Sequence, residues 1–121
     1  MAKTEDMVRV LKDLGSSTPG VEASAVVSLD GFVIASALPA DTEEDRVAAM
    51  AAATLSLGER SAGELNRGNF EQLFIKGDNG YIVLLSIGAE AILIVLARAD
   101  AKLGLIFLDT RRTAEKIEKL L

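Results

Sequence analysis

The sequence predicts one α+β domain in which helices cover both faces of a five-stranded antiparallel sheet. Three observations support this prediction. Two short apolar runs follow a first amphipathic helix, three more follow a second, and a final helix closes the chain. The runs within each group are joined by short, Gly-containing junctions, which only antiparallel neighbours permit. The last two runs are apolar on successive residues, as expected of strands with both faces covered.

The first elements are a helix and a hairpin. Residues 5–14 carry apolar side chains at helical spacing, and Gly15 follows at the position of a C-terminal cap. The turn-forming stretch SSTPG separates this helix from the runs VEASAVVS and FVIASA. These two runs are joined by Leu29-Asp30-Gly31 and are therefore expected to form a β-hairpin.

A second helix is expected to begin where Asp41 or Thr42 caps free backbone N–H groups, and to end near Leu65. Asn66 and Gly68 follow at positions that favour termination. Four acids suit the positive end of this helix better than a metal site: Asp41, Glu43, Glu44 and Asp45.

Three strands and a last helix complete the predicted order. NFEQLFIK, YIVLLSI and AILIVLARA read as strands, with turns at residues 77–80 and 88–90. Asp100 is expected to cap the final helix. Its buried stripe is predicted to contain Leu103, Leu105, Ile106, Leu108, Ile117, Leu120 and Leu121.

Composition limits the class of protein. A chain of 121 residues, half of them hydrophobic, suits a single domain spanning residues 1–121. The net charge of -5 has the wrong sign for binding nucleic acid. The longest apolar run, residues 91–97, is far below the roughly 20 residues that span a bilayer, so no membrane insertion is expected. The absence of cysteine fits a cytoplasmic location.

Catalytic chemistry finds little support in the sequence. The chain has no histidine and no cysteine, which excludes Ser-His triads, HExxH zinc sites and thiol nucleophiles. No Gly-x-x-x-x-Gly-Lys-Ser/Thr phosphate loop occurs. We therefore expect no catalytic residue, no cofactor and no metal, and we do not expect this protein to be an enzyme.

The second helix carries more apolar surface than one sheet needs. One stripe suits the sheet of its own chain: Val47, Ala51, Leu55, Gly58, Ala62 and Leu65. An adjacent stripe has no partner within the chain: Met50, Ala53, Thr54, Leu57 and Ser61. Met50 and Leu57 would each forgo about 1.5–3 kcal/mol if left in water. The alternative is that alanine, the best helix former, simply fills an ordinary surface.

A second surplus lies in the strand within NFEQLFIK, which would occupy the outer end of the sheet with one side unpaired. Two copies that pair edge to edge, with their Ala-rich helices beside the join, would satisfy both surpluses. The hypothesis is a twofold homodimer. Its interface is expected to contain Ala49, Ala52, Ala53, Ser56, Phe70, Gln72 and Phe74.

Several motifs resemble the roadblock family, which includes the dynein light chain roadblock type and the MglB-like regulators of small Ras-like GTPases. The motifs are VVSLDGFVIAS, IKGDNGYIVLLSIG and RADAKLGLIFLDT, and the likeness runs from about Met7 to Leu121. The resemblance implies a profilin-like fold of order α-β-β-α-β-β-β-α, with one helix on one sheet face and two on the other. It also implies dimers formed through the second helix and the edge strand.

The resemblance implies a function as well. MglB-like members bind a small Ras-like GTPase across the paired second helices and stimulate its GTP hydrolysis or nucleotide exchange. In this chain the corresponding contact surface would contain Arg46, Met50, Ala53, Leu57, Arg60 and Glu64. The alternative to a role in this contact is that Arg46 and Arg60 are two ordinary exposed arginines.

Three other functions stay open at the level of sequence. Roadblock relatives also serve as adaptor subunits of larger complexes without affecting nucleotide turnover. A small-molecule sensor would need a polar cavity between sheet and helix, which the densely apolar strands disfavour. A free-standing enzyme is the least favoured reading.

Overall fold

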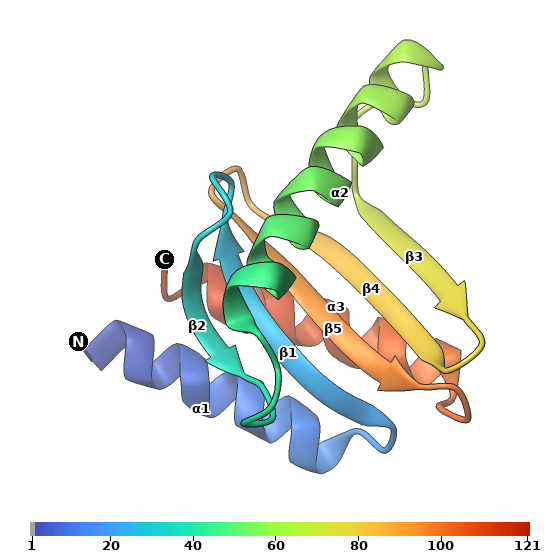
Figure 1. Cartoon of the computed structure of the whole chain (residues 1–121). Coiled ribbons are helices and arrows are strands. Elements are labelled where there is room, and N and C mark those ends of the chain that lie inside the picture. The colour runs from blue at the N-terminus through green and yellow to red at the C-terminus, as the bar shows by residue number, and fades with distance from the viewer. Residues whose placement is uncertain (1) are drawn as a thin grey trace.

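The computed structural model describes residues 2–121, with side chains placed from residue 3, and its elements follow the predicted order (Figure 1). They are α1 (Ala2–Ser17), β1 (Val21–Ser28), β2 (Val33–Ala37), α2 (Glu44–Glu64), β3 (Gln72–Gly77), β4 (Gly80–Ile87), β5 (Ala91–Arg98) and α3 (Leu103–Glu118). The order predicted from the apolar runs and their turns is therefore confirmed.

The strands form one five-stranded antiparallel sheet of order β2-β1-β5-β4-β3. β1 pairs with β2 in a hairpin and, on its other side, with β5. The β1–β5 pairing joins the two halves of the sheet. β3 pairs with β4 on one side only. The predicted position of this strand at the outer end of the sheet is thus confirmed, and one side of its backbone is open.

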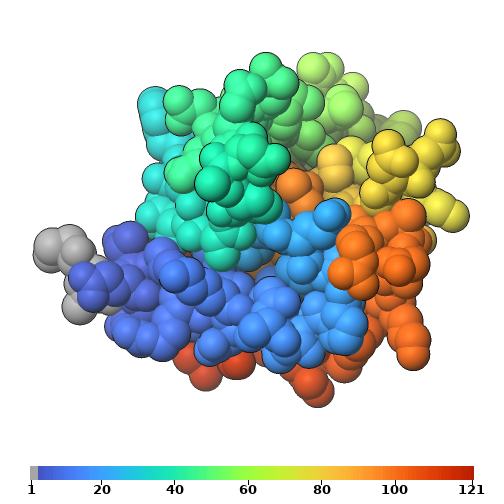
Figure 2. Space-filling view, turned by 60° about the horizontal axis from the view of Figure 1, so that its bottom comes forward, coloured from blue at the N-terminus to red at the C-terminus, as the bar shows by residue number. Residues whose placement is uncertain are grey.

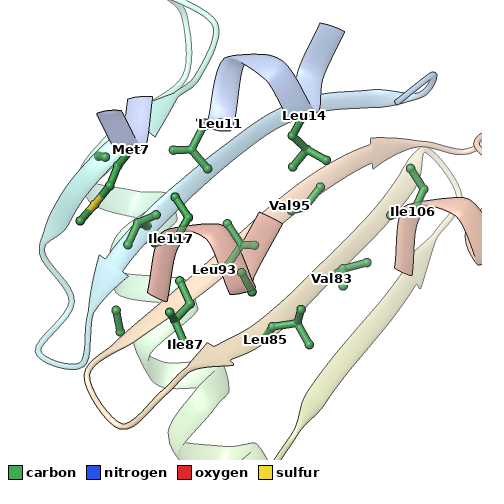
Figure 3. Close-up of a cluster of buried hydrophobic side chains, with 14 of the residues drawn as sticks. Met7, Leu11, Leu14, Val83, Leu85, Ile87, Leu93, Val95, Ile106 and Ile117 are labelled. Atoms are coloured by element: carbon green, nitrogen blue, oxygen red, sulfur yellow. The ribbon is translucent and has the colours of Figure 1, made fainter. Parts of the chain in front are cut away.

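The molecule has three layers. Figure 1 shows α1 and α3 on one face of the sheet and α2 on the other, and Figure 2 shows these layers from one end, with α2 above and α1 and α3 below. The core under α1 and α3 is built largely from long aliphatic side chains (Figure 3): Met7, Leu11, Leu14, Val83, Leu85, Ile87, Leu93, Val95, Ile106 and Ile117. The smaller core under α2 contains Ala25, Val27, Ala48, Ala51, Leu55, Leu84, Ile92 and Ile94.

Burial of β5 on both faces of the sheet explains why its sequence is apolar at successive positions. Leu93 and Val95 point into the core under α1 and α3, whereas Ile92 and Ile94 point into the core under α2. Side chains of a strand alternate between faces, so a strand covered on both faces needs no polar alternation. The expected coverage of both sheet faces is confirmed.

The predicted end of the first helix is wrong. α1 continues through Gly15 to Ser17. The hydroxyl of Ser17 donates to the carbonyl of Asp13 at 2.6 Å, and the N–H of Thr18 donates to the carbonyl of Leu14 at 3.1 Å. These bonds satisfy carbonyl groups of the last turn, so glycine at position 15 does not have to end the helix.

The predicted N-terminal caps are also wrong. Glu43 occupies the N-cap position of α2 and Lys102 that of α3, and neither makes a side-chain capping bond. Asp100 instead accepts a hydrogen bond from Nε of Arg98 at 3.0 Å. The C-terminal prediction for α2 holds, because Leu65 is its C-cap and Asn66 follows with a φ of 57°.

Two predicted buried stripes need correction. Leu105 and Leu108 of α3 are exposed, and so is Leu65 at the end of α2, whereas Ala48 is fully buried. The buried stripe of α3 follows helical spacing from Ile106 and includes polar residues: Ile106, Thr110, Thr113, Ala114 and Ile117. The prediction was right for Ile106 and Ile117 and wrong for Leu105 and Leu108, because hydrophobicity alone does not tell which side of a leucine-rich first turn is buried.

Among residues 2–121, none of the helices combines the length and the apolar character needed to cross a membrane.

Candidate functional site

The outer side of α2 exposes two large apolar side chains. Met50 is 59% exposed and Leu57 is 63% exposed. They lie seven residues apart, so they point in nearly the same direction from the helix. The helix packs against its own sheet with Ala48, Ala51, Leu55 and Gly58. The apolar surface of α2 is therefore wider than the surface its own sheet covers.

An open groove of about 530 Å³ lies between the C-terminal half of α2 and the segment that leads into β3. Gly58 forms part of its floor, because a Cβ at this position would lie 2.6 Å from Cε1 of Phe70. Glycine thus permits the ring of Phe70 to lie directly against the helix. The apolar part of the lining comes from Leu57, Gly58, Ala62, Leu65, Phe70 and Leu73.

The sheet face beside this groove is incompletely covered. α2 crosses the sheet obliquely and leaves the later part of β3 without a helix above it (Figure 1). Ile75 of β3 is exposed there, and its cross-strand neighbour Ile82 is only half-buried. Leu96 of β5, paired with Ile82, is also half-buried. A strip of apolar sheet therefore lies next to α2 at the open edge.

Two residues predicted for the dimer interface point to the opposite face of the sheet. The ring of Phe74 stacks on Tyr81 with centroids 5.7 Å apart and meets Phe107 of α3 edge to face at 5.5 Å. Gln72 accepts a hydrogen bond from Arg111 of α3 at 3.4 Å. Their backbones lie in the open edge strand, but their side chains belong to the α3 layer.

The alanines predicted for the same interface lie on the other flank of α2. The β1–β2 turn packs there, since a Cβ on Gly31 would lie 3.6 Å from Cβ of Ala52 and 3.9 Å from Cα of Ala49. Ser56 follows Ala52 by one turn and is exposed on the same flank. The structure therefore does not bring Ala49, Ala52 and Ser56 together with the β3 edge.

The six residues assigned by resemblance to the GTPase contact form one stripe. Their spacing follows the helical repeat, and all of them are exposed: Arg46, Met50, Ala53, Leu57, Arg60 and Glu64. Arg46 pairs with Glu43 at 3.1 Å, and Arg60 pairs with Glu64 at 3.2 Å. Both guanidinium groups thus lie in the surface of the helix, next to a carboxylate.

The sequence interpretation missed the two most prominent side chains of the β1–β2 turn. Leu29 and Phe32 are both exposed. The sequence places Phe32 at the start of the apolar run FVIASA, whereas in the structure β2 begins at Val33 and the ring of Phe32 is exposed. Within residues 3–121 no group of three or more His, Cys, Asp or Glu side chains is placed to hold a metal ion.

The three layers and the antiparallel order define a roadblock/profilin-like α+β domain. Profilin II of Acanthamoeba castellanii superposes with a TM-score of 0.62 at 14% identity, covering 90% of this chain and 94% of that one. Residues 7–97 match the Roadblock/LC7 domain, and the chain belongs to this family.

The chain is also similar to a relative at higher identity, and several solved structures share its fold. The uncharacterized protein MJ1340 of Methanocaldococcus jannaschii is 43% identical over 112 residues, covering 93% of this chain and 96% of that protein. The gliding protein MglB of Thermus thermophilus superposes with a TM-score of 0.88 at 22% identity, covering 99% of this chain and 91% of that one. A Roadblock/LC7 domain from Streptomyces avermitilis gives a TM-score of 0.87 at 19% identity, with 93% and 94% covered.

Proposed function

We propose that this protein forms a twofold homodimer whose paired α2 helices bind a small Ras-like GTPase and modulate its GTP hydrolysis or nucleotide exchange. The observation that carries the proposal is the exposure of Met50 and Leu57 beside an apolar groove and an open edge strand. The role is that of a regulator without catalysis of its own, which suits a chain that lacks histidine and cysteine.

The open edge supports the dimer. Among residues 2–121, no strand pairs with β3 on the side away from β4. Pairing with β3 of a second copy would satisfy these groups and extend the sheet across both copies. A twofold axis at the join would bring α2 of each copy over the uncovered sheet of the other, where Ile75 and Ile82 lie.

The two flanks of α2 then take different roles. Leu57 and Ser61 line the groove on the β3 side and belong to the dimer join, together with Phe70. Ala49 and Ala52 lie on the flank next to the β1–β2 turn, away from the join. This division revises the interface expected from the sequence, which placed these alanines at the dimer contact.

The GTPase partner rests on the family assignment and on the resemblance to MglB-like regulators. The outer stripe of α2, without Leu57, which lies at the join, would form a contact surface that continues across the two copies: Arg46, Met50, Ala53, Arg60 and Glu64. Its apolar centre and charged ends, Arg46 and Arg60, fit a protein surface better than a small ligand.

The decisive experiment uses the Ras-like GTPase encoded nearest to this gene. Single-turnover GTP hydrolysis and release of a fluorescent GDP analogue are measured with and without the protein. We expect at least one of the two rates to rise. Binding with neither rate changed would instead support an adaptor subunit, and absence of binding would contradict the proposed partner.

Replacement of Arg60 by alanine tests the contact stripe. The Arg60–Glu64 ion pair is exposed, so the free energy of unfolding should change by at most about 0.5 kcal/mol. Arg60→Ala should nevertheless weaken GTPase binding. Arg9→Ala is the matched control, because Arg9 forms a similarly exposed ion pair with Asp6 on α1. Equal losses of binding in both variants, or a marked loss of stability in Arg60→Ala, would contradict the assignment.

A further inference from the structure

The β1–β2 turn presents an aromatic side chain to solvent. Phe32 is 71% exposed, the largest fraction among the exposed large hydrophobic residues of the described chain, and its neighbour Leu29 is exposed as well. Single exposed apolar residues are common on protein surfaces. This pair differs because it sits at the tip of a structured turn directly beside α2 (Figure 1).

Hydrogen bonds fix the turn. The N–H of Ser28 donates to the carbonyl of Phe32 at 2.8 Å, and the N–H of Gly31 donates to the carbonyl of Ser28 at 3.0 Å. The hydroxyl of Ser28 accepts from the N–H of Phe32 at 3.1 Å. Gly31 has a φ of 91° and packs on α2. The backbone beneath Phe32 is thus held before binding, which lowers the entropy lost when a partner covers the ring.

Acidic residues lie in the turn and along the flank of α2 that the turn contacts. Asp30 lies in the turn, and Asp45 and Glu59 lie seven residues on either side of Ala52, on the flank that the turn contacts. Within residues 3–121 none of these three carboxylates takes part in an ion pair. A surface with an exposed aromatic group and unpaired carboxylates on the same flank is complementary to a partner surface that combines an apolar pocket with basic residues.

We propose that Phe32 is an anchor residue that selects the GTPase partner, inserting into an apolar pocket of a surface whose basic residues face Asp30 in the turn and Asp45 and Glu59 along α2. This inference rests on the proposed function and extends the contact from the outer stripe of α2 to its turn flank. A second copy of this chain is the less suitable occupant. The turn lies on the flank opposite the β3 edge, and two such acidic flanks would repel each other.

The test compares Phe32→Ser with Leu108→Ser. Leu108 is 44% exposed on α3, in the opposite layer, and serves as the matched loss of an exposed apolar side chain. Binding of the Ras-like GTPase encoded nearest to this gene, loaded with a non-hydrolysable GTP analogue, is measured by calorimetry. As for an anchor residue at the centre of an interface, Phe32→Ser should raise the dissociation constant about tenfold or more, and Leu108→Ser should leave it within about twofold.

A spectroscopic readout makes the test independent of affinity. The chain has no cysteine, so Leu29→Cys, beside Phe32 in the turn, and Leu108→Cys each introduce one labelling site for a polarity-sensitive dye. Addition of the GTPase should shift the emission of the dye at position 29 and not at position 108. Raising the salt concentration should weaken wild-type binding, and should do so less for Asp30→Asn.

Three results would overturn the inference. Wild-type affinity in Phe32→Ser would show that the ring is no anchor. A change in the oligomeric mass of the Phe32→Ser variant, measured without the GTPase, would show that the turn is a contact between copies. Failure of the wild-type protein to bind the GTPase at all would refute the proposed function, and this inference with it. Only the first two results leave the proposed function standing.

Discussion

Leu57→Ala is the most direct test of the dimer join. Leu57 is exposed on α2 and lines the groove beside β3, so a single chain gains little from its side chain. The substitution keeps a good helix former at the position, and the free energy of unfolding of a single chain should hardly change. Any large effect must then come from contacts between copies.

The size of the effect follows from the exposure. Complete burial of a leucine side chain contributes about 1.5–3 kcal/mol, so covering the 63% of Leu57 that is exposed contributes about 1–2 kcal/mol. A twofold interface contains two copies of the residue, which gives about 2–4 kcal/mol for the dimer. Because 1.4 kcal/mol corresponds to a factor of ten, the dissociation constant of the dimer should rise about 30-fold to 1000-fold.

Sedimentation velocity over a dilution series measures this constant. Leu108→Ala is the control, because it removes a partly exposed leucine from α3, on the face of the sheet opposite α2. The dissociation constant of the Leu108→Ala dimer should equal that of the wild-type dimer. An unchanged dissociation constant in Leu57→Ala would refute the placement of the join, and a wild-type protein that sediments as a single chain at micromolar concentration would refute the dimer itself.

Two further predictions concern stability, measured by urea unfolding. Gly80 has a φ of 154°, and a Cβ there would run into the carbonyl oxygen of Ala97, so Gly80→Ala should lose at least about 1–3 kcal/mol from backbone strain alone. Gly15→Ala, where an added methyl meets no atom within 4 Å, should gain up to about 1 kcal/mol; equal stability of the two variants would contradict the turn geometry. Thr18→Val removes the hydroxyl that donates to Asp109 at 2.7 Å and should lose about 1–3 kcal/mol. Wild-type stability of Thr18→Val would show that this bond does not tie α1 to α3.

The arrangement of strands could be predicted because its signals are local. Gly31, Gly80 and Gly88 all have positive φ angles and lie at or beside the hairpin turns. Glycine adopts this conformation without the steric penalty of a side chain, so turns are readable from the sequence. The doubly covered β5 was equally visible, since a run of successive apolar residues has no polar face to give to water.

The residues at which helices begin, and the side of each helix that faces the sheet, could not be predicted from such local signals. Asp41 and Asp100 are good capping residues by type, but a cap needs specific backbone angles at one position, and the chain places Glu43 and Lys102 there. The first turn of α3 is rich in leucine on several sides, so its sequence does not say which side faces the sheet. Packing against the core selects Ile106.

The sequence by itself indicated that α2 carries more apolar surface than one sheet can cover, because residues 47–58 contain no charged side chain on any side of the helix. Only the tertiary structure decided which flank each residue occupies. Two close approaches fix the rotation of α2 over the sheet, that of Gly31 to Ala52 on one flank and that of Phe70 to Gly58 on the other. Each contact joins residues that are distant in the chain, so no local pattern encodes it. The separation of the groove beside β3 from the flank that contacts the β1–β2 turn follows from these two contacts.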